Sequence, residues 1–182
     1  TLVGVISAET SLYFPDFRAP ERTFQLLTQV AGRAGRGAAP GRVLVQTYDP
    51  DNPCLAHVRS HDYDGFYRDE IVRREEPRWP PFCRLANLRI TAPTPAGAED
   101  GAMRCAAAAR RLCERDGALG REVEVLGPSP AVIARVRNRW RWQVLLKGSR
   151  QSALRQVALA ALAALPPRGS RAVVDVDPAS ML

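Results

Sequence analysis

The chain of 182 residues is long enough for one ordinary domain or two small ones. Hydrophobic residues make up 46% of it, which is normal for a folded protein, and no apolar run approaches the roughly 18 residues that span a bilayer. The net charge of +7 is distributed unevenly, because residues 78–182 hold sixteen arginines and one lysine against eight acids. This basic segment favours a polyanion such as nucleic acid as partner, although an arginine-rich genome would produce the same bias.

Residues 1–50 carry the pattern of an α/β layer. Residues 2–7 form a short apolar run, typical of a strand in a parallel sheet that is covered on both faces. A helical pattern begins at Pro20 and runs into a glycine-rich segment, after which residues 42–48 form a second strand. Two strands do not complete a sheet, and the chain starts without a methionine or a basic leader. The segment is therefore expected to be the edge of a larger sheet in a longer protein.

Residues 51–77 are acidic and predicted to form a helical connector over 54–76, which ends at Pro77, Pro80 and Pro81. Beyond it the pattern predicts strand, helix, three strands, helix and strand, in an open sheet with two helices on one face. These elements are expected at residues 84–92, 95–115, 122–126, 131–137, 139–147, 149–165 and 171–177, with Ser149 as a possible cap.

The four cysteines are separated by 29, 22 and 8 residues, and none forms a C-x-x-C pair. They are Cys54, Cys83, Cys105 and Cys113. A structural zinc site needs four converging ligands, usually with one close pair, so no metal site is predicted and the thiols are expected to be reduced and structural. His57 and His61 lie four residues apart, but no third ligand completes a site, and a solvated helix face is expected for them.

Residues 29–37 read QVAGRAGRG and place Arg33 and Arg36 directly after Gly32 and Gly35. Glycine lets the backbone approach a ligand closely, and a guanidinium group presents donors that match phosphate oxygens. Two such groups could hold a terminal phosphate and stabilise the charge that develops in phosphoryl transfer, a device worth about 10³–10⁵ in rate. From the residues alone, a flexible basic loop or an RNA contact explains the segment equally well.

Residues 138–143 read NRWRWQ and are predicted to follow a hairpin turn at Asn138. Strand alternation puts Trp140 and Trp142 on one face and two arginines on the other. With two more arginines across the hairpin, four guanidinium groups are expected to crowd together and to suit nucleic-acid phosphates. These four are Arg135, Arg137, Arg139 and Arg141. Trp142 is expected in the core, whereas Trp140 could lie in the core or stack on unpaired bases.

The run Q-x-x-G-R-x-G-R from Gln29 is motif VI of superfamily 2 helicases, and PDFRAPERTFQLLTQVAGRAGRG closely resembles the PriA family of primosomal replication-restart helicases (primosomal protein N′). The resemblance continues at residues 79–82, 126–128, 139–143 and 175–178, and so covers nearly the whole chain. It implies an α/β plus α+β architecture. Residues 1–50 would be the C-terminal part of the second RecA-like helicase lobe, 51–77 a helical connector, and 78–182 a DNA-binding α+β domain similar to ribosomal protein S10.

By motif position, the resemblance implies that Arg36 is the arginine finger on the γ-phosphate of ATP, Arg33 a second phosphate contact and Gln29 a nucleotide-sensing residue. Gly32 and Gly35 would complete the nucleotide contact. ATP with Mg²⁺ would be bound mainly by a first lobe, because the chain has no G-x-x-x-x-G-K-[ST] and no D-E-x-H motif. The 182 residues alone are therefore not expected to hydrolyse ATP. The zinc insert of the family lies upstream, and none of the cysteines here matches it.

The resemblance also implies branched and single-stranded DNA, the tail of single-stranded-DNA-binding protein and other primosome proteins as partners, in the cytoplasm and without a membrane. Lys147 and Arg150 are the candidates for the tail carboxylates, although Arg150 could equally be an ordinary helix-start arginine. The intact protein would be an ATP-dependent 3′→5′ DNA helicase that recognises stalled forks and initiates replication restart. The alternatives are a non-enzymatic DNA-binding or scaffold protein with a vestigial helicase motif and, more weakly, an RNA-binding protein.

Overall fold

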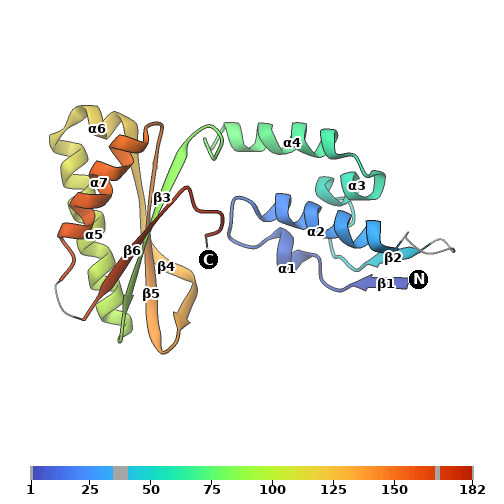
Figure 1. The fold of residues 1–182 in the computed structure, drawn as a ribbon, viewed down its shortest axis with the longest axis horizontal. Helices are drawn as coiled ribbons and strands as arrows, with labels where there is room; N and C mark the ends of the chain where they lie inside the picture. The colour runs from blue at the N-terminus through green and yellow to red at the C-terminus, as the bar shows by residue number, and fades with distance from the viewer. Residues whose placement is uncertain (1, 35–40, 167–168, 182) are drawn as a thin grey trace. The chain divides into compact units, whose positions relative to one another are not determined.

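The computed structural model describes residues 2–34, 41–166 and 169–181, so Gly35 and Arg36 lie outside the described residues. The chain divides into two compact units, a first unit of Thr1–Pro77 and a second unit of Arg78–Leu182 (Figure 1). None of the described helices is long and apolar enough to cross a membrane.

The described part of the first unit contains two short strands and four helices. In chain order they are β1 (Leu2–Val5), α1 (Glu9–Leu12), α2 (Ala19–Ala34), β2 (Arg42–Val45), α3 (Pro53–Ser60) and α4 (Tyr63–Glu75). The two strands pair in parallel, and α2 buries Phe24 and Leu27 in the core beside them. On the other face of the strand pair, the side chains of Leu2 and Leu44 are 66% and 54% exposed. Both faces of the strand pair are thus apolar, as the sequence predicted, but only one is covered within the described residues.

Residues 54–76 are largely helical, as predicted, but they form two helices, because the chain turns between α3 and α4. His61 ends α3 in the left-handed conformation with φ 55°, which stops the helix. Asp62 then caps α4 by accepting a hydrogen bond from Gly65 N at 2.8 Å. Asn52 and Pro53 mark the start of α3 in the same way, since Asn52 Oδ1 accepts from Cys54 N at 3.0 Å.

The second unit is an α+β fold with an antiparallel sheet in the order β4-β5-β3-β6. Its described elements are β3 (Arg84–Ala92), α5 (Pro95–Arg115), α6 (Gly117–Glu122), β4 (Val123–Val136), β5 (Arg139–Gly148), α7 (Gln151–Ala163) and β6 (Arg171–Val176). Helices α5 and α7 lie on one side of the sheet (Figure 1). The predicted bounds of β3 and α5 are confirmed.

Three predictions about the second unit are wrong. The expected strand, turn and strand over 122–137 form one long strand, β4, in which the pairing register shifts on either side of residues 129–130. Gly127 lies at one shift with φ 89°, a conformation that favours glycine. A short helix, α6, precedes β4, and Ser149 is not the cap of α7, because Arg150 holds that position without a side-chain hydrogen bond.

Small residues bring α5 close to the sheet. Ala102, Cys105 and Ala106 on α5 are fully buried, as are Leu88 and Ile90 on β3. The β3 residues that pack against the helices are those at even positions, so its odd positions, including the buried Leu85 and Asn87, point to the opposite side of the sheet. This opposite side, called the second face below, carries Arg89 and Thr91 on β3, Arg139, Arg141, Gln143 and Lys147 on β5, and Arg171, Val173 and Asp175 on β6.

Candidate nucleotide and nucleic-acid sites

The last turns of α2 present Gln29, Gly32 and Arg33 on one exposed helix face. They lie at positions i, i+3 and i+4, opposite the buried Phe24 and Leu27. Arg33 has no hydrogen bond or ion pair within the described part of the chain, and a Cβ atom placed at Gly32 would meet nothing within 4 Å. The helix C-terminus favours a cation at Arg33. Three of the five predicted nucleotide contacts therefore share an accessible surface.

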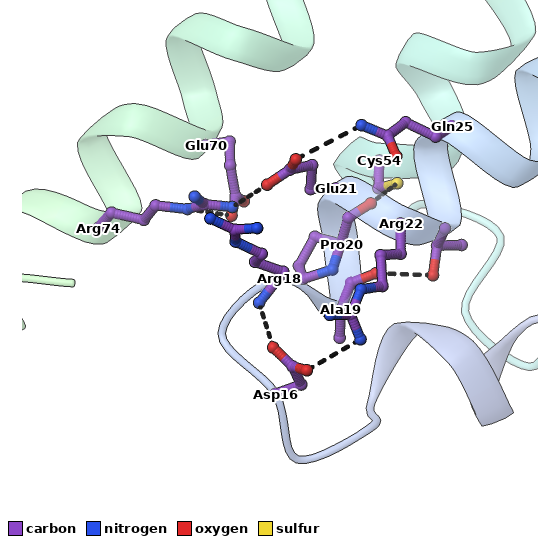
Figure 2. Close-up of polar contacts among 11 residues, drawn as sticks. Asp16, Arg18, Ala19, Pro20, Glu21, Arg22, Gln25, Cys54, Glu70 and Arg74 are labelled. Carbon is purple, nitrogen blue, oxygen red and sulfur yellow. Dashed lines mark hydrogen bonds and ion pairs between the residues drawn. The ribbon is translucent and has the colours of Figure 1, made fainter. Parts of the chain in front are cut away.

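Ion pairs hold the beginning of the same helix (Figure 2). The buried Asp16 carboxylate accepts from Arg22 Nη1 at 2.9 Å and from Arg18 N at 2.9 Å. From α4, Arg74 Nε donates to Glu70 Oε1 at 2.8 Å and Arg74 Nη2 to Glu21 Oε2 at 3.0 Å. These contacts fix the first turn of α2 against α4, and through the rigid helix they set the direction in which Gln29 and Arg33 point.

His57 does not lie on a solvated helix face, as the sequence suggested. Its side chain is 19% exposed, with Nε2 2.9 Å from Asp69 Oδ2 and Nδ1 3.6 Å from Asp62 Oδ2. The hydrogen bond from His57 lowers the pKa of Asp69. His61 is exposed. The described residues include no group of three or more histidine, cysteine or carboxylate side chains arranged to hold a metal ion.

All four thiols are free, and three of them are buried. Burial raises the pKa of each, most clearly that of Cys54, to about 11. Cys54 Sγ lies 3.5 Å from the carbonyl oxygen of Pro20 and donates to it. Thiols of raised pKa are poor nucleophiles and metal ligands, so these cysteines contribute packing.

The hairpin between β4 and β5 turns on two residues, Arg137 and Asn138, both with positive φ as type I′ turns require. This turn pairs Arg135 with Trp140, and the Arg135 guanidinium carbon lies 5.3 Å from the centre of the Trp140 ring. The predicted crowding of four hairpin arginines is therefore wrong, because Arg135 lies on the face of the tryptophans. Trp142 packs against the core, as predicted.

The second face brings Arg139 and Arg141 together with two arginines that the sequence did not indicate. Arg89 of β3 lies opposite Gln143, and both Arg141 and Arg171 lie opposite Thr91. Alternation within β3 places Arg89 on this face, but which strands lie beside it depends on long-range pairing. Arg89 and Arg171 were therefore missed.

The two candidates for partner binding are already paired. Lys147 Nζ lies 3.0 Å from Glu124 Oε2, and Arg150 Nε lies 2.5 Å from Glu122 Oε1. The side chain of Arg150 is 63% exposed and that of Lys147 only 13%. A partner carboxylate would have to compete with Glu122 for Arg150, and it would reach Lys147 with difficulty.

The chain resembles known proteins over its whole length. The family model described as the primosomal protein N C-terminal domain matches residues 75–179. Replication restart protein PriA of Synechocystis sp. is 45% identical over 147 residues, 81% of this chain, and that of Bacillus subtilis 42% over 154 residues, 85% of this chain. PriA of Treponema pallidum is 39% identical over all 182 residues. These matches cover 17%, 18% and 27% of the relatives. The chain belongs to the primosomal protein N C-terminal domain family.

Proposed function

We propose that this chain acts in replication restart as the C-terminal part of an ATP-dependent 3′→5′ DNA helicase that recognises stalled forks. The observation that carries the proposal is the shared exposed face of Gln29, Gly32 and Arg33 at the end of α2, in a chain whose relatives are replication restart proteins. In this proposal the first unit is part of a RecA-like lobe, and Arg33 and Arg36 contact the phosphates of ATP.

The residues of α2 fit a nucleotide phosphate. Arg33 has a charged donor group with no partner in the described chain, and the surface at Gly32 leaves room for a ligand. Gln29, one turn earlier, offers a neutral donor and acceptor for positioning. ATP and Mg²⁺ would be held mainly by a phosphate-binding lobe outside these 182 residues, because the chain contains no phosphate-loop motif.

The test uses the intact protein, including the upstream lobe, and measures ATP hydrolysis with and without forked DNA. Arg36→Ala is expected to lower the DNA-stimulated rate at least ~10³-fold, and Arg33→Ala is expected to lower it by a smaller factor. Arg68→Ala is the matched control, since this exposed arginine lies on α4, outside the motif. A rate within a few-fold of wild type for Arg36→Ala would refute the finger assignment. DNA binding by a wild-type protein that hydrolyses no ATP would favour the non-enzymatic alternative.

The proposed partners are branched and single-stranded DNA, other primosome proteins and the acidic tail of single-stranded-DNA-binding protein, all in the cytoplasm. The exposed side chain of Arg150 supports a tail contact at the start of α7. Arg150→Glu should weaken binding of a tail peptide, while Arg155→Glu, one turn further along α7, should not. Equal loss in the two variants would show that general charge, rather than this position, attracts the peptide.

A further inference from the structure

We infer that the second face of the sheet binds the phosphodiester backbone of single-stranded DNA through arginines from three strands: Arg89, Arg139, Arg141 and Arg171. The inference rests on the proposed function only for the choice of DNA as ligand. It replaces the hairpin predicted from the sequence by a site that spans β5, β3 and β6.

The register of the sheet places these four arginines side by side. Arg141 and Arg171 lie on the strands flanking β3, each opposite Thr91, so they are separated by two strand spacings, about 10 Å. Arg89 is the diagonal neighbour of Arg141 on the same face, at about 7–8 Å between backbone positions. Arg139 precedes Arg141 along β5 by two residues, about 6.7 Å. The four side chains therefore form a cluster across three strands, close enough together to contact several phosphates of one DNA strand.

The charges at this end of the second face are not balanced. At the other end, Lys147 is matched by Glu124 at 3.0 Å. Among the described residues that the register places near the four arginines, Asp175 is the one carboxylate, and its Oδ2 lies 3.4 Å from Arg89 Nη2. Long charged side chains are seldom buried without a partner, so an excess of guanidinium groups on a half-buried surface favours an anionic ligand.

Arg139 is held in position while its charge stays available. Its Nη2 donates to the carbonyl oxygens of Thr91 at 3.1 Å and Gly169 at 3.2 Å. Carbonyl groups orient the guanidinium but carry no net charge to neutralise it. An oriented and uncompensated guanidinium group loses little entropy when it binds a phosphate.

Arg141 has no hydrogen bond or ion pair within the described residues and is half-buried. Burial, and then the positive charge of Arg89, lower its pKa. A phosphate between Arg89 and Arg141 would reverse this repulsion. Trp140 and Trp142 point to the other side of the sheet, and the ring of Trp79 lies 5.3 Å from Lys147 Nζ at the far end of the second face, so at the four arginines we expect contacts to the backbone rather than stacking on bases.

The test measures binding of a fluorescent dT20 oligonucleotide by the 182-residue chain over 50–500 mM salt. Four phosphate contacts predict a slope of log K against log salt near −3. Arg141→Gln and Arg171→Gln should each reduce the slope by about 0.7, which at 50 mM salt means roughly eight-fold weaker binding. Arg171→Gln, at an exposed strand end, keeps the test valid if Arg141→Gln disturbs folding.

Two matched controls remove the same charge elsewhere: Arg155→Gln on α7, and Arg135→Gln on the tryptophan side of the hairpin. Both should bind dT20 within two-fold of wild type. The inference would be overturned if the control and face variants lost the same affinity for dT20. It would also be overturned if the double variant Arg141→Gln/Arg171→Gln bound dT20 as tightly as wild type. A U20 oligonucleotide that binds like dT20 supports contacts to the shared backbone, whereas much tighter binding of U20 overturns the choice of DNA. These results do not depend on ATP hydrolysis, so the inference and the proposed function can fail separately.

Discussion

Arg74 Nη2 on α4 lies 3.0 Å from Glu21 Oε2 in the first turn of α2 (Figure 2). The same guanidinium binds Glu70 one turn earlier on α4, and the side chains of Arg74 and Glu70 are only 12% and 10% exposed. One arginine thus links the helix that ends in the glycine–arginine segment to the last helix of the first unit.

Arg74→Ala is expected to destabilise the first unit by about 2–3 kcal/mol, because it leaves the buried Glu70 carboxylate without its guanidinium. All four tyrosines lie in the first unit and all three tryptophans in the second. The urea midpoint measured by tyrosine near-ultraviolet circular dichroism should therefore shift, while the midpoint measured by tryptophan fluorescence should not. Arg104→Ala, which removes an exposed pair on α5, should change either curve by less than about 0.5 kcal/mol. A shift of the tryptophan curve as large as that of the tyrosine curve would contradict this local role.

Leu88→Ala should destabilise the second unit by about 3 kcal/mol, since Leu88 is fully buried between the sheet and its helices. Leu159→Ala makes the same chemical change at a position that is 56% exposed, and should cost less than about 1 kcal/mol. Tryptophan fluorescence during urea unfolding measures both. Similar losses in the two variants would mean that the core is not centred on β3.

Asp177 should make the second unit sensitive to acid. A hydrogen bond from Arg84 Nε, at 3.1 Å, lowers the pKa of Asp177 below its ordinary value of 3.8. The resulting stabilisation is complete above the unfolded value and is lost as the pH falls through the lower folded value. Between pH 5 and pH 2, the urea midpoint of Asp177→Asn should therefore fall less steeply than that of wild type. Because both side chains are about 40% exposed, the difference at neutral pH should stay within about 1 kcal/mol. If the urea midpoints of wild type and Asp177→Asn changed equally with pH, this link between the pKa of Asp177 and stability would be refuted.

Cys54 should react slowly with a thiol reagent in the native chain. With a pKa of about 11, only about one thousandth of this thiol is ionised at pH 8, and its side chain is buried. Timed labelling with an aromatic disulfide, followed by mass spectrometry, should find Cys54 unmodified in buffer and fully modified in urea. Cys113, which is partly exposed, provides the internal comparison. Complete labelling of Cys54 within minutes in native buffer would contradict its burial.

The elements that the sequence predicted best are those with local signals at both ends. Strand β3 alternates between core and second face, and α5 begins with Thr94 as cap, accepting from Gly97 N at 3.1 Å, followed by Pro95. The break between α3 and α4 was missed because it depends on a left-handed backbone at His61, a conformation that only a few per cent of non-glycine residues adopt. The shifts within β4 depend on pairing with β5 and have no local pattern beyond Gly127.

The sites were predicted less well than the elements. Gln29, Gly32 and Arg33 share one face because helical spacing is local. The position of Arg135 was wrong because the hairpin was centred on Asn138 alone. A two-residue turn shifts the pairing by one position and moves that side chain across the sheet. Arg89 and Arg171 join Arg141 only through strands that are distant in sequence, which alternation within one strand does not reveal.

Helix α2 is held by ion pairs at its beginning and carries the motif residues at its end, so a small tilt about its beginning moves the motif residues. The 12 residue steps from Glu21 to Arg33 span about 18 Å, so a tilt of roughly 5° about Glu21 would displace Arg33 by about 1.6 Å. A displacement of that size separates a formed hydrogen bond from a broken one. Small movements of α4 would therefore be amplified at Arg33, so the ion pair between Arg74 and Glu21 would influence a phosphate contact about three helical turns away.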